Sequence, residues 1–307
     1  MFKLAVVGSV AAFATASNVH PINDDIVKEI KAKATTWTAH EVHENPLRHR
    51  TFEQIQGLLG THPETGASNE FNAPEVFDTP ANFDSRQKWG SCVHAIRDQQ
   101  RCGSCWAFGS SEALSDRFCI ASNGAIDVVL SPEDLVSCDK GDMGCNGGWI
   151  QNAWSYLEKT GIVEDSCFPY SAGSGTAPKC ATQCVNSTQT FKKYKCKKGS
   201  VVVATTPEQI QSALVAGGPM ETRFDVYADF MSYKGGIYKH VTGARQGGHA
   251  IKLVGYGVED GQKYWILANS WGPAWGENGY FRMAYGECGI DATVLGCEPE
   301  VSYSFLE

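Results

Sequence analysis

The spacing of apolar residues changes along the chain and divides it into regions of different predicted structure. Between about residues 104 and 160, two stretches have helical spacing: SCWAFGSSEALSDRF (104–118) and GGWIQNAWSYLEKT (147–160). From about residue 200 onward, short apolar stretches separated by glycines are typical of strands: GSVVVAT (199–205), HAIKLVGYG (249–257), KYWILANSW (263–271) and GYFRMAY (279–285). The sequence therefore predicts an α+β protein in which a mostly helical lobe precedes a mostly β lobe, with a cleft between them as the place for a site.

The first 78 residues differ from the rest. A basic start, the apolar run LAVVGSVAAFATA and small residues at its end are typical of a secretory signal peptide, which we assign to residues 1–17. Residues 18–78 contain five of the eight histidines, no cysteine, one helical stretch at 24–34, and then glycine- and proline-containing chain. This composition predicts a removable pro-segment with an exposed linker, followed by a mature protein at 79–307, of which about 79–200 is mainly helical and about 201–307 mainly β. We expect no membrane span in the mature protein.

The twelve cysteines all lie between Cys92 and Cys297, which agrees with export, because most cysteines of an exported protein form disulfides. The triplet NST makes Asn186 a candidate glycosylation site. We therefore expect the secretory pathway, ending in a lysosome- or phagosome-like vesicle or outside the cell. The net charge is −8, and the one basic run, residues 192–198, is interpreted as a solvated face, so nucleic-acid binding is not expected.

Cys102 and Cys105 form a C-x-x-C pair, which is open to three chemistries. A thioredoxin-like redox pair belongs early in a βαβ pattern, whereas the strand-like stretches here gather in the C-terminal half. A zinc site needs a second close pair of ligands, and no histidine pair lies near Cys180 and Cys184. A third role, Cys105 as a catalytic nucleophile, fits the sequence better than the other two. Cys105 lies where a helix is predicted to begin, and a helix N-terminus and a nearby imidazole both favour a thiolate.

A base that works near or below neutral pH should be a histidine. Three histidines follow residue 79: His94, His240 and His249. His94 lies beside a cysteine in irregular chain and His240 at an exposed strand end, so neither is favoured as the base. His249 is preferred, since it is flanked by small residues on a predicted strand, which is a rigid mount.

A third group should orient the imidazole. Asn269 ends the next predicted apolar strand and is the candidate for this role. Trp271 and Trp275 follow it and could shield an Asn–His hydrogen bond from water.

Taken together, four stretches resemble the papain-like cysteine peptidases and occur in that family's order: DQQRCGSCWAF, CNGGW, GGHAIKLVGYG and NSWGPAWGENGYF. The resemblance covers the chain from about Thr79 to its end. Within the family it is to the cathepsin B-like branch, on stretches such as NFDSRQKW, VYADFMSYKGGIYKHVTG and ECGID. It implies a two-lobe fold with a helical left lobe and a β-barrel-like right lobe.

The resemblance also implies roles for individual residues. Cys105 would be the nucleophile, His249 the general base and later acid, and Asn269 the residue that orients it. Gln99 would supply a side-chain donor to the oxyanion hole, together with the Cys105 backbone N–H. The residue after that glutamine is usually glycine in the family, and here it is Gln100.

Further residues are assigned to substrate binding and to disulfides by the same resemblance. Gly147 and Gly148 would pair with an extended substrate, Trp271 would line the cleft, and Thr293 would lie at the end of the pocket for the second residue before the cut. The stretch after Cys167 is short and lacks the histidine pair of the occluding loop. The implied disulfides are Cys92–Cys119, Cys102–Cys145, Cys138–Cys180 and Cys167–Cys184, which leaves Cys196, Cys288 and Cys297 unassigned.

The resemblance implies a cysteine endopeptidase made as a zymogen that hydrolyses peptide bonds through a Cys–His pair and an acyl-enzyme. Peptides and proteins would be its substrates, its own propeptide an inhibitor, and cystatin-like inhibitors further partners. We expect no cofactor and no metal, and we expect the protein to be a monomer. Two other classes stay open at this point: a catalytically silent binding protein of the same fold, and a disulfide oxidoreductase in which Cys102 and Cys105 cycle together.

Overall fold

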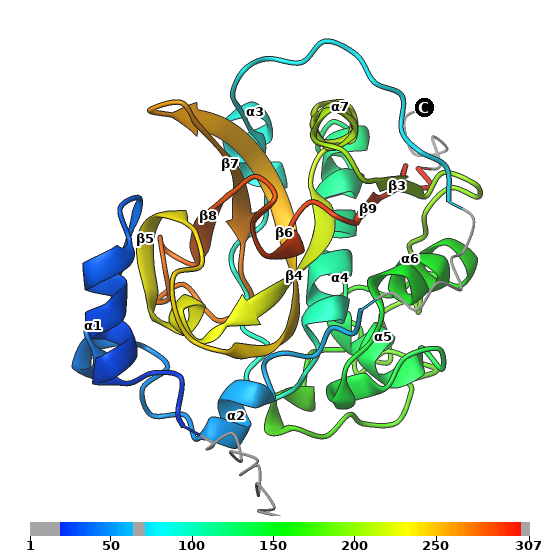
Figure 1. Cartoon of the computed structure of the whole chain (residues 1–307). Helices are drawn as coiled ribbons and strands as arrows, with labels where there is room; N and C mark the ends of the chain where they lie inside the picture. Colours follow the sequence, from blue (N-terminus) through cyan, green and yellow to red (C-terminus); the bar gives the residue numbers. More distant parts are fainter. Residues whose placement is uncertain (1–18, 64–70, 302–307) are drawn as a thin grey trace, which may run out of the picture.

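The protein is described by a computed structural model for residues 19–63 and 71–301, so the predicted signal peptide lies outside the described residues. Figure 1 shows an α+β architecture with the sheet on one side and most helices on the other. The helices are α1 (Asp24–Lys33), α2 (Phe52–Gln56), α3 (Ser85–Trp89), α4 (Cys105–Ala121), α5 (Pro132–Cys138), α6 (Ile150–Lys159) and α7 (Pro207–Gly217). The strands are β1 (Trp37–Ala39), β2 (Phe83–Asp84), β3 (Val202–Ala204), β4 (Met220–Tyr227), β5 (Tyr233–Tyr238), β6 (Arg245–Glu259), β7 (Gln262–Ala268), β8 (Tyr280–Ala284) and β9 (Val294–Gly296).

Helix α4 forms the centre of the molecule. Almost all of its residues are buried, from Cys105 at its first turn to Cys119 near its end. It packs against β4 and β6 of the sheet and against α5 and α6 of the helical lobe. A helix enclosed by protein needs no polar face, so its sequence has no clear division into apolar and polar sides. Among the helices of the described residues, none is long and apolar enough to cross a bilayer.

The strands form one sheet in the order β1-β5-β8-β7-β6-β4-β9-β3, with β2 paired to β6. The predicted strands at 249–257, 263–271 and 279–285 correspond to β6, β7 and β8. The sheet begins at β1 and ends at β3 without closing, so the right lobe is an open, curved sheet instead of a barrel. Antiparallel pairing of β6 with β4 on one side and β7 on the other holds β6 in the middle of the lobe.

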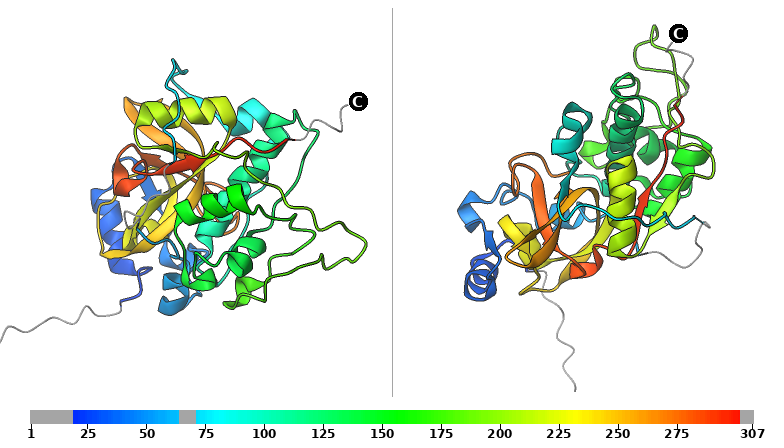
Figure 2. Two further views of the ribbon diagram at one scale, coloured as in Figure 1. Left: turned by 90° about the vertical axis from the view of Figure 1, so that its right-hand side faces the viewer. Right: turned by 90° about the horizontal axis from the view of Figure 1, so that it is seen from above.

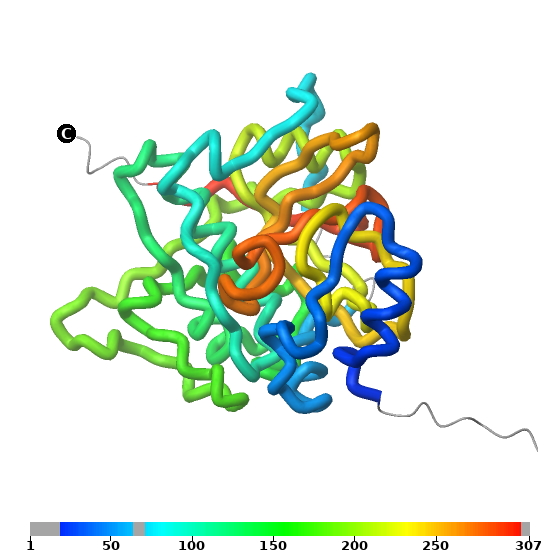
Figure 3. The backbone as a smooth tube through the Cα atoms, turned by 90° about the vertical axis from the view of Figure 1, so that its left-hand side faces the viewer, coloured from blue at the N-terminus to red at the C-terminus, as the bar shows by residue number. Residues whose placement is uncertain are grey.

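Part of the pro-segment is built into this sheet. Strand β1 pairs with β5, and the Trp37 indole donates a hydrogen bond to the Lys239 carbonyl oxygen at 2.9 Å. The Trp37 ring is buried against Tyr233 and Tyr238. Figure 3 shows the blue N-terminal segment lying over the yellow strands of the β lobe. The part of the pro-segment around β1 therefore docks on the β lobe through main-chain pairing and an aromatic anchor.

Five disulfides are present within the described residues: Cys92–Cys119, Cys102–Cys145, Cys138–Cys180, Cys167–Cys184 and Cys196–Cys297. The first four are the pairs that the resemblance implies, and the fifth joins two of the unassigned cysteines. Cys105 and Cys288 are free. Three of the disulfides hold the green chain that follows α6 and extends away from the helical lobe (Figure 2).

A buried ion pair connects the two lobes. Lys252 on β6 donates to the Asp116 carboxylate on α4 at 2.7 Å, and both side chains are almost completely buried. The other Asp116 oxygen contacts His94 Nδ1 at 2.7 Å. Glu112, one turn earlier on α4, is buried beside this pair. Burial raises the pKa of Glu112 to about 7, although Lys252 acts in the opposite direction.

Glu112→Gln should stabilise the protein at alkaline pH and not at acid pH. The folded-state pKa of about 7 lies above the ordinary value of 4.5, so ionising the buried carboxyl removes stability as pH rises through this interval. We expect the free energy of unfolding to increase by about 3 kcal/mol at pH 8 and to change little at pH 4, as measured by urea unfolding. Glu208→Gln, at an exposed position, is the control. An equal gain at both pH values would contradict this origin.

Candidate active site

Cys105 is the first residue of α4 and is fully buried in this form of the protein. Its Sγ lies 3.0 Å from Thr61 Oγ1 of the pro-segment. Burial raises the pKa of the Cys105 thiol, and hydrogen bonding to Thr61 and to the backbone N–H groups of Ala250 and Gly60 opposes that rise only in part. The sulfur is therefore kept as a thiol while the pro-segment covers it, and a thiol is a poor nucleophile.

His249 lies on β6, one residue before Ala250. Its Nε2 donates to Asn269 Oδ1 at 2.8 Å, which leaves Nδ1 as the nitrogen that can take a proton. The Trp271 ring lies over the imidazole with 4.7 Å between ring centres, so it shields the His–Asn hydrogen bond. Burial lowers the pKa of His249 to about 4, against the opposing effects of Asn269 and the Leu58 backbone. The imidazole is thus neutral beside a neutral thiol.

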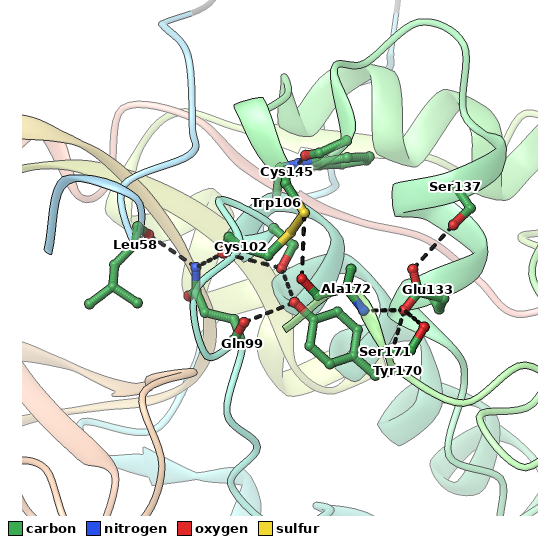
Figure 4. The surroundings of a disulfide bond; sticks show 12 residues. Leu58, Gln99, Cys102, Trp106, Glu133, Ser137, Cys145, Tyr170, Ser171 and Ala172 are labelled. Carbon is green, nitrogen blue, oxygen red and sulfur yellow. Dashed lines mark hydrogen bonds between the residues drawn. A yellow bond between two sulfur atoms is a disulfide. The ribbon is translucent and has the colours of Figure 1, made fainter. Parts of the chain in front are cut away.

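Gln99 is held with its amide N–H groups toward the site. Its Nε2 donates to the Leu58 carbonyl oxygen at 3.1 Å and to the Cys102 carbonyl oxygen at 2.9 Å (Figure 4). The Ser270 hydroxyl donates to Gln99 Oε1 at 2.7 Å, which fixes which end of the amide faces Leu58. Tyr170 donates to the Gln99 carbonyl oxygen at 2.8 Å. Ser270 and Tyr170 were not found from the sequence, although Ser270 directly follows Asn269.

Gln100 adopts the left-handed conformation that the usual glycine would take, with φ of 59°. A side chain in this region costs roughly 1–2 kcal/mol. The loop is held because Gln100 N donates to Asp98 Oδ1 at 2.7 Å, and its side chain packs against Gly173. The non-glycine residue therefore keeps the loop geometry.

The pro-segment passes between the two lobes and makes isolated β-bridges at Gly60 and Thr61. On the helical side, Gly148 N donates to Gly60 O at 2.8 Å and His62 N donates to Gly148 O at 3.0 Å. On the β side, Thr61 N donates to Gly248 O at 3.1 Å. Gly147, with φ of 108°, leaves no room for a side chain, because a Cβ there would lie 2.6 Å from Gly60 O. The pro-segment thus occupies the main-chain pairing site beside Cys105.

Comparison with known proteins agrees with this geometry. Residues 79–297 match the papain family cysteine proteases. The chain belongs to the papain family. It is 46% identical over 221 residues to a cathepsin B-like protein, CP3, of Giardia intestinalis, which covers 71% of this chain and 74% of that protein. It is 39% identical to cathepsin B-like cysteine proteinase 4 of Caenorhabditis elegans, over 97% of this chain and 98% of that one. The structure of procathepsin B S9 from Trypanosoma congolense superposes with a TM-score of 0.84 at 30% identity, covering 92% of this chain and 100% of that one.

As a cathepsin B-like member of the papain family, the chain is a cysteine peptidase, and its likeness to a procathepsin extends over the pro-segment. Cys102 is bonded to Cys145, so it is not half of a redox or zinc pair with Cys105.

The two histidines that were not favoured as the base have other partners. His94 bonds Asp116, and the ring of His240 stacks on Tyr227 with 3.9 Å between centres. Thr293 is half-buried directly before β9, and Asn186 is exposed.

Proposed function

We propose that this protein is a secreted or lysosomal cysteine endopeptidase that is activated by removal of residues 18–78. The mature enzyme would begin near Thr79. The proposal rests mainly on one observation: the pro-segment places Thr61 on the sulfur of Cys105 and a main-chain carbonyl, that of Leu58, on Gln99. A peptide substrate would place its scissile carbonyl at the same two groups.

The proposed reaction begins when removal of the pro-segment opens the site to water. Cys105 then transfers its proton to His249, and the thiolate attacks the peptide carbonyl carbon. Gln99 and the Cys105 backbone N–H stabilise the negative oxygen. His249 returns the proton to the leaving amine, a thioester remains, and His249 then takes a proton from the water that hydrolyses it. Asn269 accepts from Nε2 throughout, which leaves Nδ1 of the imidazole to carry the transferred proton.

Acid should favour activation, because it weakens docking of the pro-segment. His40 directly follows β1, and its backbone N–H donates to the Ser232 carbonyl oxygen. Burial and, secondarily, Lys234 lower the pKa of His40 below 6.5. Docking therefore favours the neutral imidazole, and it is weakened as the pH falls from 6.5 toward this lower pKa. The linker where we expect the cut includes residues 64–70, which lie outside the described residues.

The active site should accept internal peptide bonds, since no histidine pair is available to bind a C-terminal carboxylate. The chain between Cys167 and Cys180 is short. A hydrogen bond from Arg101 N to Gly173 O fixes the first half of this chain. Asn186 is the proposed glycosylation site, and cystatin-like inhibitors would compete for the same cleft.

Intact-mass analysis of acid-treated protein, with and without a thiol-directed epoxide inhibitor, tests this function. We expect a chain that begins near residue 79, five intact disulfides and a single epoxide on Cys105, together with cleavage of internal bonds in a long peptide. Active enzyme that retains the pro-segment, or efficient stepwise release of C-terminal dipeptides, would contradict the proposal. A Cys105→Ala zymogen is the control, because it should neither process itself nor take up the inhibitor.

Thr293 should make the enzyme prefer an apolar residue over arginine at the second position before the cut. A threonine at the end of the pocket offers no counter-charge, so a buried arginine would retain its desolvation cost. We expect kcat/KM for a Phe-Arg substrate to exceed that for Arg-Arg by at least about tenfold, and Thr293→Glu to reduce this ratio by about tenfold. Equal rates on the two substrates in the unmodified enzyme would place the pocket elsewhere.

A further inference from the structure

Strand β4 carries charged side chains on the face that looks toward the helical lobe. Phe224 and Val226 lie in the core of the sheet, so the alternate residues Glu221, Arg223 and Asp225 lie on the opposite face. Glu221 is fully buried, packs against Gly109 of α4 and accepts a hydrogen bond from the Trp154 indole at 2.7 Å. It is therefore part of the lobe interface, whereas Arg223 lies further along the strand, toward the active site.

The register of the sheet places Arg223 beside the catalytic residues. In β6 its partner is Ala250, which follows His249 and donates to the sulfur of Cys105. On the other side of β4, Thr222 pairs with Val294 of β9. The residue before Val294 is Thr293, so continuing the same antiparallel register brings Thr293 opposite Arg223. Arg223 thus lies between Ala250 and the residue assigned to the end of the substrate pocket.

The Arg223 guanidinium also borders the chain that occupies the cleft. A Cβ built on Gly248 would lie 3.3 Å from Arg223 Nη2 and 2.2 Å from the Thr61 carbonyl oxygen. Both groups therefore approach Gly248, one from the enzyme and one from the pro-segment. A peptide that replaced Thr61 would lie next to the guanidinium.

The positive charge of Arg223 is only partly compensated. Arg223 Nη2 donates to Asp225 Oδ1 at 2.9 Å, and Arg245 donates to the same oxygen at 2.8 Å. One carboxylate thus serves two guanidinium groups. Arg223 Nε is buried and makes no hydrogen bond to any described residue. The Arg223 side chain is 15% exposed, compared with 47% for Arg245, so Arg223 is the better shielded charge.

We propose that Arg223 determines substrate specificity by binding an acidic side chain at the second position before the cut. This inference rests on the proposed peptidase function. A substrate carboxylate would accept from the Arg223 guanidinium, whose Nε has no hydrogen-bond partner among the described residues, and charge-assisted hydrogen bonds of this kind are the stronger ones. The same charge repels a basic side chain. The pocket is therefore selective for acidic and apolar residues over basic ones.

Three fluorogenic peptides that differ only at this position, Glu-Arg, Phe-Arg and Arg-Arg, test the proposal on the mature enzyme. We expect kcat/KM for Glu-Arg to exceed that for Arg-Arg by about 30-fold or more. Arg223→Gln should lower the Glu-Arg to Phe-Arg ratio by about tenfold, and Arg223→Glu should raise the Arg-Arg to Phe-Arg ratio by a similar factor. Both variants should take up one molecule of the thiol-directed epoxide at Cys105, which shows that they fold.

Arg245→Gln is the matched control, because Arg245 binds the same carboxylate from a more exposed position. It should leave the Glu-Arg to Phe-Arg ratio within about twofold. A ratio that does not respond to Arg223→Gln, or that falls equally in Arg245→Gln, overturns the role of Arg223 while leaving the peptidase function intact. A mature enzyme that cleaves none of the three peptides and takes up no epoxide at Cys105 overturns the proposed function itself.

Discussion

His249→Ala should lower kcat/KM for peptide hydrolysis by about 10⁴, and Cys105→Ala should lower it at least as much. Without the imidazole, the reaction loses the group that we propose takes the proton of Cys105 and later supplies one to the leaving amine. Asn269 and Trp271 contact the ring of His249, but neither an amide nor an indole has a basic nitrogen, so neither can replace it. The loss should appear mainly in kcat, because His249 acts on the reacting atoms and contributes little to the binding of the rest of the peptide.

The measurement needs mature protein, and the variants should not process themselves. The zymogens would therefore be cut by an added protease at the linker, and the peptidase activity measured on a Phe-Arg substrate after that protease is removed. His240→Gln is the matched control, since His240 is also in the β lobe but contacts Asp229. It should retain activity within about threefold. If His249→Ala kept a tenth of the activity or more, another residue would have to be the base.

Gly60→Val should expose the active site of the intact zymogen. A Cβ atom on Gly60 would lie 1.9 Å from the Gly103 carbonyl oxygen and 2.7 Å from Gly103 Cα, all of it backbone that cannot turn aside. The segment that carries Leu58 and Thr61 would have to move away from the cleft. We expect the rate at which a thiol-directed epoxide labels Cys105 in the zymogen at neutral pH to rise about 10³-fold, which corresponds to about 4 kcal/mol of lost docking free energy.

Gly57→Ala is the control for this effect. Gly57 lies in the same segment with φ of −64°, and a Cβ there would lie 3.3 Å from Glu53 O and no closer than 3.6 Å to any other neighbour. Its zymogen should be labelled at nearly the rate of the unmodified protein. After processing, the mature enzymes from both zymogens should be identical, which separates an effect on docking from damage to the site. Unchanged labelling of Gly60→Val would mean that the pro-segment does not control access to Cys105.

The parts of the fold that could be predicted from sequence are those with a local signal. Helix α4, strands β6 to β8 and the positions of Cys105 and His249 belong to this group, because each combines a clear apolar spacing with a short motif. Strand β4 was not predicted. It carries Glu221, Arg223 and Asp225 within eight residues, so its sequence lacks the apolar character that predicted the other strands.

Contacts between distant segments account for the rest of what was missed. Strand β1 has three residues and exists because β5 pairs with it. The orientation of Gln99 depends on Ser270, which is 171 positions away in the chain. No periodicity in either stretch reports such a contact. For the same reason the resemblance could imply that the propeptide inhibits the peptidase, whereas the hydrogen bonds that it makes with Gly148 and Gly248 could be identified only from the structure.

The disulfide between Cys196 and Cys297 makes a covalent ring of the chain from β3 to β9, with a sequence separation of 101 residues. The exposed turn at Asp260 and Gly261 lies inside this ring. A nick at that turn would open the ring without releasing a fragment, because the piece that carries Asn269 would remain bonded to the piece that carries Cys105. Both cysteines of the bond are buried, so a mild reductant that keeps Cys105 reduced would leave it closed. One enzyme molecule could therefore cleave another at this turn without releasing a fragment. Electrophoresis without reductant would not distinguish the nicked molecules from intact ones.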